Sequence, residues 1–454
     1  MSFLDDDKSL EHFVVVNTVQ SEFKEFIKEI FSHNHEKICF NMRDVLKLGL
    51  KFKSYCDIID VSSIYGCENL FETVNKNLIE DDFTEYIEKK KNFQSHIKAC
   101  KAVNVNFNNH SILDLIPSST ITSLYRLRNE MVKRLWEKSD DIEWFKDSGY
   151  NRARVLYEIE QNGIMTNTEH DDLNLSAASA AWLRHLIDRT NKDGFAYVKF
   201  VPQKSKTGRV QIAKGSLKCM NIPKNSIRKS IVSRFDCGKI VTLDFNAADY
   251  RCIVAGVNDP VLNSLYDDCN DFHSRTVEIM FGENGLTDLR RKILKDVTYM
   301  YLYGGSKKVL SSSTGLSEKK INDIISHMDF MKPIYKFKED LYRASKENGY
   351  ITTPDGFTVK LDGTEHEGKV LALYGQTCTN DAFMNGLVNV HDYLKDKKSV
   401  ELFTVHDELV IDMHPDELCH LNDVSDMMEL GSAKLFGTRL KVKHKMGPNY
   451  WELK

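Results

Sequence analysis

The sequence lacks any apolar run long enough to cross a bilayer, and its first ten residues lack the apolar core of a secretory signal. These two absences lead us to expect an intracellular protein with no membrane attachment. The ten cysteines include no C-x-x-C pair, which argues against a zinc ribbon and a disulfide framework. Neither an internal repeat nor a low-complexity linker divides the chain.

Acidic residues are absent from residues 201–235, although the whole chain has a net charge of −4. The same segment is rich in basic residues, namely Lys204, Lys206, Arg209, Lys214, Lys218, Lys224, Arg228, Lys229 and Arg234. A basic stripe of this kind is typical of a surface that binds a phosphate backbone. A solvated basic loop has the same composition, so the stripe alone decides little.

At 454 residues the chain is too long for one ordinary core, and we expect two or three lobes around a cleft. Residues 1–118 mix short apolar runs, such as 38–40 and 58–61, with helical segments, which predicts a small α/β lobe. The pattern then predicts helices at 120–163, ended by Gly163, and at 177–187. A strand is predicted at 239–243, so the overall class is mixed α and β.

Two short segments each place a carboxylate at the end of an apolar strand. Residues 241–251 (VTLDFNAADYR) place Asp244 there, and residues 402–411 (LFTVHDELVI) predict a hairpin whose turn carries His406, Asp407 and Glu408. A lone aspartate in the first position is equally typical of a helix N-cap. We expect the strands to be neighbours, which would bring the carboxylates together.

Nucleotidyl transfer needs such a pair of carboxylates. Two Mg²⁺ ions roughly 3.5–4 Å apart activate the attacking 3′ hydroxyl and neutralise the leaving diphosphate, and Mg²⁺ prefers oxygen ligands. The sequence therefore predicts two Mg²⁺ ions, with Mn²⁺ as a substitute, held by Asp244 and Asp407.

Residues 289–306 predict a helix with one chemically distinct stripe. Its members recur every four residues, a drift of only roughly 40° per step on a helix; they are Arg291, Lys295, Tyr299 and Tyr303. The basic side chains are suited to a triphosphate, and the tyrosines to stacking on a base or sugar. A solvated face with two half-buried aromatics would have the same spacing.

In this order and at these separations, the three segments resemble motifs A, B and C of the family A (polymerase I-like) DNA polymerases. Asp244 matches the metal aspartate of motif A, and the segment from His406 to Glu408 matches the His-Asp-Glu of motif C. The residues that fit motif B without a gap are Arg291, Lys295, Tyr299, Tyr303 and Gly304. The resemblance covers about residues 120–454.

Smaller elements support the same resemblance. Arg209 lies in a Thr-Gly-Arg element whose arginine contacts the primer strand in the family, and His273 falls where the family has a histidine near the incoming phosphates. Gln376 resembles a minor-groove glutamine of the family, although Gly375 and Gln376 stand in the reverse order. The resemblance also implies that His406 and Glu408 support the primer end or the metal turn.

The resemblance implies an α+β right-hand polymerase fold with an antiparallel-sheet palm, helical fingers and a reduced thumb. The expected boundaries are a degenerate 3′–5′ exonuclease-like α/β lobe at 1–118, a short thumb and palm entry at 119–206, palm with motif A at 207–251, fingers with motif B at 252–350, and palm with motif C at 351–454. The implied activity is template-directed DNA synthesis. The implied partners are primer-template DNA, dNTPs and a processivity or replisome partner.

Two departures from the family pattern change the expected activity. The family usually has a motif A glutamate that blocks the 2′ hydroxyl of a ribonucleotide; Asp249 is one methylene shorter, so we expect weaker sugar discrimination. In the N-terminal lobe, Asn41 and Asp44 lie roughly where the second exonuclease motif lies, but the other exonuclease carboxylates are missing, and residues 118–120 (SST) replace the third motif. Because the lobe lacks the carboxylates that would bind two metal ions, we expect no proofreading.

Three other functions fit parts of the pattern. A single-subunit RNA polymerase shares the palm and a similar motif B, but lacks the glutamate after the motif C aspartate. A catalytically inactive DNA-binding accessory subunit would have little reason to keep both aspartates together with Arg291 and Lys295. A nuclease could use two aspartates and Mg²⁺, but would not need the motif B stripe.

Overall fold

The computed structural model describes residues 2–4, 10–12, 37–39, 58–60, 148–168, 175–202, 205–266 and 271–454. The chain divides into two compact units. One comprises Met1–Glu158 and Phe200–Pro202, and the other comprises Ile159–Lys199 and Gln203–Lys454. The candidate exonuclease positions Asn41, Asp44 and 118–120 lie outside the described residues.

In the first unit, four short strands are described: β1 (Ser2–Leu4), β2 (Leu10–His12), β3 (Lys37–Cys39) and β4 (Ile58–Asp60). β1 pairs with β2 antiparallel, and β3 pairs with β4 in parallel. The parallel pair joins two of the apolar runs that predict an α/β lobe. Helix α9 (Tyr150–Asn162) ends directly before Gly163, whose φ of 67° confirms the predicted stop.

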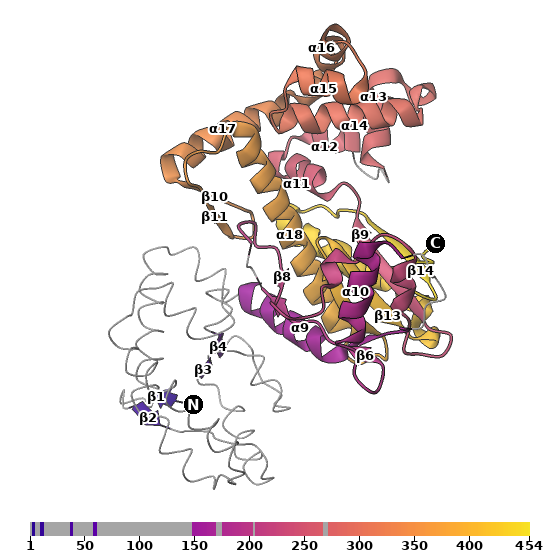
Figure 1. Cartoon of the computed structure of the whole chain (residues 1–454). Helices are drawn as coiled ribbons and strands as arrows, with labels where there is room; N and C mark the ends of the chain where they lie inside the picture. Colours follow the sequence, from indigo (N-terminus) through magenta and orange to yellow (C-terminus); the bar gives the residue numbers. More distant parts are fainter. Residues whose placement is uncertain are drawn as a thin grey trace, which may run out of the picture. The chain divides into compact units, whose positions relative to one another are not determined.

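Most described elements belong to the second unit (Figure 1). The strands are β5 (Ile164–Met165), β6 (Phe195–Ala196), β8 (Gln211–Ile212), β9 (Lys239–Phe245), β10 (Tyr350–Thr352), β11 (Thr358–Lys360), β12 (Val400–Val405), β13 (Glu408–Met413) and β14 (Val442–Gly447); β7 (Phe200–Val201) belongs to the first unit. The α-helices are α10 (Ala177–Ile187), α11 (Ala248–Val257), α12 (Pro260–Tyr266), α13 (Phe272–Phe281), α14 (Asp288–Leu302), α15 (Lys307–Thr314), α16 (Glu318–Ser326), α17 (Lys332–Asn348), α18 (Glu367–Leu394) and α19 (Leu421–Phe436). Short 3-10 turns lie at Cys219–Asn221, Ser226–Ser230, Glu283–Gly285, Asp329–Met331 and Pro415–His420. The helix predicted at 177–187 coincides with α10.

The central sheet has the strand order β12-β13-β9-β14, and each neighbouring pair is antiparallel. β9 is apolar and rich in β-branched residues, and Ile240, Val241 and Leu243 are fully buried. The strand predicted at 239–243 and the hairpin predicted at 402–411 are confirmed. They are neighbours in the sheet, as a shared carboxylate site requires. β14, which the sequence did not predict, pairs with the other side of β9.

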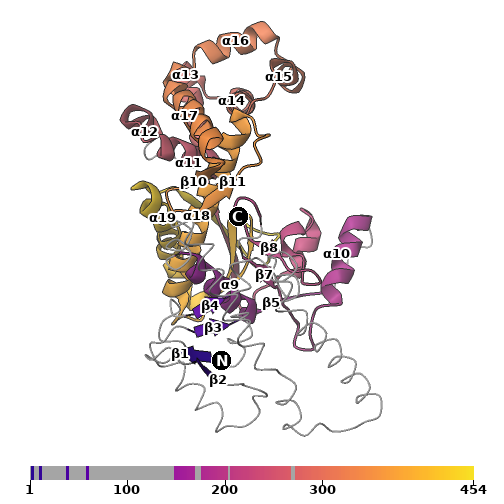
Figure 2. The same ribbon diagram turned by 90° about the vertical axis from the view of Figure 1, so that its left-hand side faces the viewer.

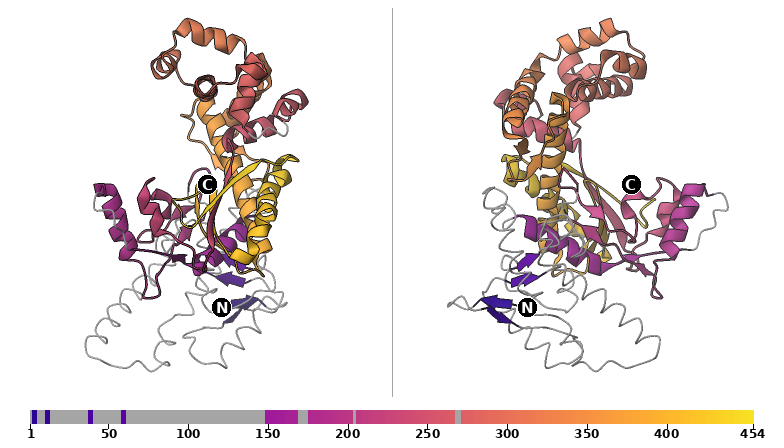
Figure 3. Two further views of the ribbon diagram at one scale, coloured as in Figure 1. Left: turned by 90° about the vertical axis from the view of Figure 1, so that its right-hand side faces the viewer. Right: turned by 60° about the vertical axis from the view of Figure 1, so that its left-hand side comes forward.

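Two long helices cover one face of this sheet. α18 and α19 pack against each other, and α19 also contacts β14. Both run along the same face in Figures 2 and 3, whereas α10 lies apart from them on the other side. α18 is buried around most of its circumference, because α11 and α17 pack on it as well. The sheet is therefore backed by a rigid helical layer.

Helices α13 to α16 form a separate group in Figure 1, in which each helix packs against the next. Side-chain caps fix where two of them begin: Asp271 accepts bonds from the first backbone N–H groups of α13, and Thr287 accepts one from Arg290 at the start of α14. The helix predicted within 289–306 is confirmed as α14. It ends one residue before Tyr303, and the following Gly304 has a φ of 88°.

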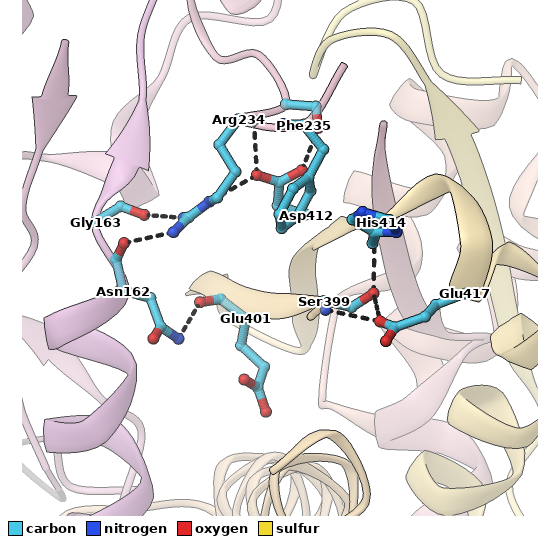
Figure 4. A network of polar contacts seen from close by, with 10 residues as sticks. Asn162, Gly163, Arg234, Phe235, Ser399, Glu401, Asp412, His414 and Glu417 are labelled. Atoms are coloured by element: carbon cyan, nitrogen blue, oxygen red, sulfur yellow. Dashed lines mark hydrogen bonds and ion pairs between the residues drawn. The ribbon is translucent and has the colours of Figure 1, made fainter. Parts of the chain in front are cut away.

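A buried polar network fixes the end of β13 that lies away from the hairpin turn (Figure 4). The carboxylate of Asp412, which is fully buried, accepts bonds from Ser233 Oγ at 2.5 Å and from Arg234 N and Nε at 2.9 and 3.0 Å. The Arg234 guanidinium also donates to the carbonyl oxygens of Asn162 and Gly163 at 2.9 and 2.7 Å. This buried ion pair is thus compensated by hydrogen bonds on both sides.

In the part of the chain that the structure describes, no helix combines the length and the apolar character needed to span a membrane. Five cysteines of that part are free thiols, at positions 219, 237, 252, 378 and 419.

Candidate active site

Three carboxylates meet at one end of the central sheet. Glu408, the first residue of β13, is the direct pairing partner of Asp244 on β9, and Asp407 occupies the two-residue turn just before it. Directly paired residues of antiparallel strands point to the same face with Cβ atoms about 4.5–5.5 Å apart. Segments more than 150 residues apart in sequence thus deliver Asp244 and the hairpin acids to one place, as the sequence predicted.

The carboxylates of this cluster repel one another. Asp244 keeps access to solvent, yet its partial removal from water and the charges of Asp407 and Glu408 raise its pKa to about 7. Burial also raises the pKa of Glu408. Two lysines of the edge strand β14, Lys443 and Lys445, act on Asp244 in the opposite direction, and Lys443 is its direct pairing partner. Such mutual repulsion favours the binding of a cation between the carboxylates.

Asp244 and Asp407 are suited to bind Mg²⁺ together with phosphate groups of a substrate. Among the described residues no group of three or more His, Cys, Asp or Glu side chains is arranged to hold a metal. Mg²⁺ is usually bound by one or two carboxylates together with substrate phosphates and water. Two aspartates at one end of a sheet, one of them exposed to solvent, meet that requirement.

The backbone is strained on both sides of the carboxylate cluster. His406, which is exposed in the hairpin turn, has a φ of 59°, and Ala247, three residues after Asp244, has a φ of 51°. Residues with a Cβ atom seldom adopt this region, and the cost is of order 1–3 kcal/mol each. Both distortions lie within three residues of a predicted metal ligand, Asp244 or Asp407.

Glu408 is oriented by the C-terminal tail. Tyr450 Oη donates a 2.6 Å hydrogen bond to Glu408 Oε1, and the Arg228 guanidinium stacks 4.5 Å above the Tyr450 ring. The Tyr450 backbone N–H donates to the carbonyl oxygen of Ile231, which ties the tail to the segment before β9. The basic stripe therefore contributes Arg228 to the support of Glu408.

Helix α14 presents the predicted cations beside α13. Arg291 Nε donates to Asp271 Oδ2 at 2.8 Å, and this ion pair holds the pKa of Asp271 well below its usual range. Lys295 lies one turn further along and is exposed. His273, buried at the start of α13, has its pKa lowered to about 4 by burial and by the charges of Lys295 and Arg291. The three predicted phosphate ligands are thus brought together, with Asp271 as an orienting group that the sequence pattern did not reveal.

Tyr299 of α14 and Tyr303, which directly follows the helix, both lie near Asp249, and Tyr299 also lies near Asp407. Their rings stack with centroids 5.8 Å apart, and Tyr299 also lies 5.5 Å from the ring of His273. Burial raises the pKa of Tyr299 to about 12, and the charges of Asp249 and Asp407 act in the same direction. Residues of all three predicted motifs therefore share one region. The Tyr303 hydroxyl is buried there without a hydrogen-bond partner in the described structure.

Asp249, in the first turn of α11, is held from two sides. Its Oδ1 lies 3.7 Å from Arg209 NH2, and the Thr379 hydroxyl of α18, which donates to Cys252 Sγ at 3.6 Å, is close enough to lower the pKa of Asp249. Burial nevertheless raises the pKa of Asp249, because desolvation outweighs both partners. The sequence predicted Asp249 and Arg209 as separate contacts to sugar and primer, whereas the structure joins them as an ion pair.

Two glycines allow α18 to approach this region closely. A Cβ atom on Gly375 would lie 3.1 Å from the backbone oxygen of Asp249, and one on Gly368 would lie 2.3 Å from the backbone carbonyl of Tyr303. Gln376, the predicted minor-groove contact, follows Gly375 and is half-buried. α18 thus touches both the end of α14 and the turn that carries Asp249.

Sequence reasoning missed several supporting residues because their contacts are long-range. Asp271, Tyr450 and Lys443 lie 20, 42 and 199 positions from the residues they meet, Arg291, Glu408 and Asp244. Asp271 had a local signal, since an aspartate directly before a helical segment predicts a cap. Nothing local distinguishes Tyr450 or Lys443.

Comparison with known proteins gives a consistent result. The sequence model of the family described as DNA polymerase family A matches residues 109–452. The DNA polymerase of Mycobacterium phage D29 is 22% identical over 240 residues, which cover 51% of this chain and 38% of the relative. DNA polymerase I of Lactococcus lactis subsp. lactis is 24% identical over 301 residues, which cover 62% and 34% respectively. The chain therefore spans little more than a third of the length of these relatives.

A solved structure has a similar fold. The POL domain of Pol1 from M. smegmatis, in complex with DNA primer-template and dNTP, superposes with a TM-score of 0.61 and 16% sequence identity. The match covers 78% of this chain and 78% of that one.

Proposed function

The chain belongs to DNA polymerase family A, and on that premise we propose that it carries out template-directed DNA synthesis. A dNMP is added to the 3′ hydroxyl of a primer, and diphosphate leaves. The α+β polymerase fold predicted from the sequence is confirmed by the family match and the structural neighbour. The observation that carries the proposed reaction is the pairing of β9 with β13, which places Asp244 beside the Asp407 turn, together with the charge interaction between Asp407 and Tyr299 of α14.

Asp244 and Asp407 would hold the divalent ions, Mg²⁺ or in its place Mn²⁺. When bound, these ions supply positive charge for the attacking hydroxyl and the leaving diphosphate. The protein contributes position. Paired strands fix both carboxylates, and Tyr450 keeps Glu408 beside them, where Glu408 and His406 support the primer end or the metal turn.

The incoming triphosphate binds beside α14 in this proposal. Arg291, oriented by Asp271, and Lys295 bind its phosphates. His273 is neutral near pH 7 because of its low pKa, so it donates a hydrogen bond without adding charge. Tyr299 and Tyr303 stack beside the base and sugar.

The primer and template lie along the basic segment 201–235 in the proposed palm, with Arg209 and Gln376 as DNA contacts. Movement of the proposed fingers, residues 252–350, would complete the site after the nucleotide binds. We also propose that the chain does not proofread and that a processivity or replisome partner assists it.

Primer extension with the purified chain tests the function. A labelled primer on a longer template, with Mg²⁺ and four dNTPs, is expected to lengthen in the order that the template dictates, and a mismatched 3′ end is expected to stay intact without dNTPs. Extension by NTPs alone would point to an RNA polymerase, and shortening of DNA to a nuclease. Binding of the DNA, seen as slower migration in a gel, without primer extension would point to an inactive accessory subunit.

Asp249→Glu is expected to strengthen sugar discrimination. The native carboxylate is drawn toward Arg209 and Thr379, and the buried Tyr303 hydroxyl nearby has no partner. One extra methylene extends the carboxylate toward the sugar pocket, where such a change is worth about 1–3 kcal/mol. We expect the ratio of kcat/KM for a dNTP over the matching NTP to rise by about tenfold or more.

Single-nucleotide insertion with dATP and ATP measures this ratio. Asp249→Ala serves as the opposite control, since it enlarges the pocket and is expected to lower the ratio below that of the native protein. If both variants discriminate as the native protein does, Asp249 does not contact the sugar.

A further inference from the structure

Basic residues alternate along the edge strand beside the carboxylate cluster. Between residues 439 and 445, every second position is basic: Arg439, Lys441, Lys443 and Lys445. Side chains two apart on a strand point to the same face. Lys443 pairs directly with Asp244, Lys445 pairs with Thr242, and the Lys441 carbonyl accepts a bond from Asn246 N. The row of cations therefore passes Asp244 at Lys443, and its Lys441 and Arg439 end leads away from Asp244.

The row leads into a pocket of about 500 Å³ beside α11, within the size range of small-molecule sites. Three cations line it, Arg251, Arg439 and Lys441, and no carboxylate does. The remaining wall is largely apolar and includes Tyr266, Phe272 and Phe436. None of the candidate active-site residues lines this pocket, so it is a separate feature of the fold.

Two cations of the pocket, Arg439 and Lys441, remain accessible to a ligand. Lys441 lies 3.5 Å from Glu429, and Arg439 lies 3.7 Å from Asp426, but both cations are at least 40% exposed. The Arg439–Asp426 pair is exposed on both sides, and such a pair contributes little, typically below about 1 kcal/mol. Glu429 is buried, but it also accepts a hydrogen bond from the backbone N–H of Val442, so it keeps one partner when Lys441 turns to a ligand. An anion can therefore compete for Arg439 at small cost, and for Lys441 while Glu429 stays hydrogen-bonded.

We propose that this pocket, together with the neighbouring Lys443 on β14, is a second anion site that binds an oligophosphate, a di- or triphosphate chain. Arginine suits phosphate through its planar fork, and lysine acts as a point charge. Lys441 and Lys443 are two strand residues apart, roughly 6.6–6.8 Å, so a phosphate chain can contact both. The oligophosphate that binds there is either the diphosphate released beside Asp244 or the triphosphate of a nucleotide. This identification of the ligand rests on the proposed function.

Equilibrium dialysis of the full chain with radiolabelled inorganic diphosphate, without DNA or divalent ions, tests the site. Arg439→Gln/Lys441→Gln is expected to weaken binding at least tenfold, and Arg439→Gln alone, which changes an exposed side chain, at least threefold. Lys319→Gln/Lys320→Gln removes the same charge from the exposed face of α16 and is expected to leave binding unchanged. Lys295→Ala, which alters the α14 phosphate site, is expected to preserve binding to the pocket.

Unchanged diphosphate binding in Arg439→Gln/Lys441→Gln, or loss of all binding in Lys295→Ala, overturns the proposal. Competition identifies the source: inorganic triphosphate and dATP are expected to displace diphosphate equally if only the phosphate chain binds, and dATP more tightly if the aromatic wall holds the base. Because the assay contains no primer, it does not depend on polymerisation. Diphosphate binding without primer extension would therefore refute the proposed function alone.

Discussion

Replacing Asp244 or Asp407 with asparagine is expected to lower the rate of primer extension by about 10³-fold or more. Asparagine keeps the size of the side chain but removes the charge that holds the divalent ions. Metal-ion catalysis is worth several kcal/mol, and each 1.36 kcal/mol is a factor of ten in rate. Single-turnover extension of a primer by one nucleotide in Mg²⁺ measures the loss.

Stability separates this catalytic role from a structural one. The pKa of Asp244 is raised to about 7 in the folded chain from an unfolded value of 3.8, so the folded state holds its proton more tightly. This contribution to stability is fully present below pH 3.8 and is lost as the pH rises toward 7. Asp244→Asn is therefore expected to melt at or above the native temperature at pH 8 without divalent ions, while being inactive.

Asp416→Asn is a suitable control, because Asp416 is exposed and pairs only at the surface with Lys398 and His414. It is expected to keep native activity and melting temperature. Extension by Asp244→Asn or Asp407→Asn within tenfold of the native rate would show that the two carboxylates do not hold the catalytic ions.

Asp412→Ala is expected to destabilise the second unit by about 3–5 kcal/mol, the usual cost of removing one partner of a buried ion pair. Asp412 is fully buried, and its loss leaves Arg234 and Ser233 without their carboxylate (Figure 4). Because β13 also carries Glu408 and follows the Asp407 turn, activity is expected to fall with stability. Denaturation by urea, followed by circular dichroism, measures the change.

Two further variants sharpen this experiment. Asp416→Ala breaks an exposed ion pair and is expected to cost less than about 1 kcal/mol. Arg234→Met/Asp412→Leu removes both charges and is expected to recover much of the stability lost in Asp412→Ala. A cost below about 1 kcal/mol for Asp412→Ala would mean that the network does not hold β13.

Local patterns in the sequence were sufficient to predict the helices and strands that carry the proposed chemistry. β9, the β12–β13 hairpin, α10, α14 and the stop at Gly163 each have a clear apolar period or a clear breaker. β14 had neither, because its residues Lys443, His444 and Lys445 are all exposed in succession. α18 lacked a visible helical period because it is buried on nearly every side.

Partnerships across the fold were harder to predict than elements. Motif resemblance placed Arg209 and Asp249 in separate roles, while the structure pairs them. It gave Tyr450 no role, while the structure gives Tyr450 a hydrogen bond to Glu408. Each of these contacts depends on how distant segments pack, which no local period encodes.

The close contacts of α18 make it a mechanical link as well as part of the core. This single rod of 28 residues, about 42 Å long, touches the end of α14 at Gly368 and the Asp249 turn at Gly375, and then packs along α19. Backbone in direct contact with backbone leaves no soft side chain to absorb a displacement. In the proposed function, a tilt of α14 when a nucleotide binds would therefore displace α18 as well. The proposed sugar contact of Asp249 and triphosphate binding at α14 would then be coupled.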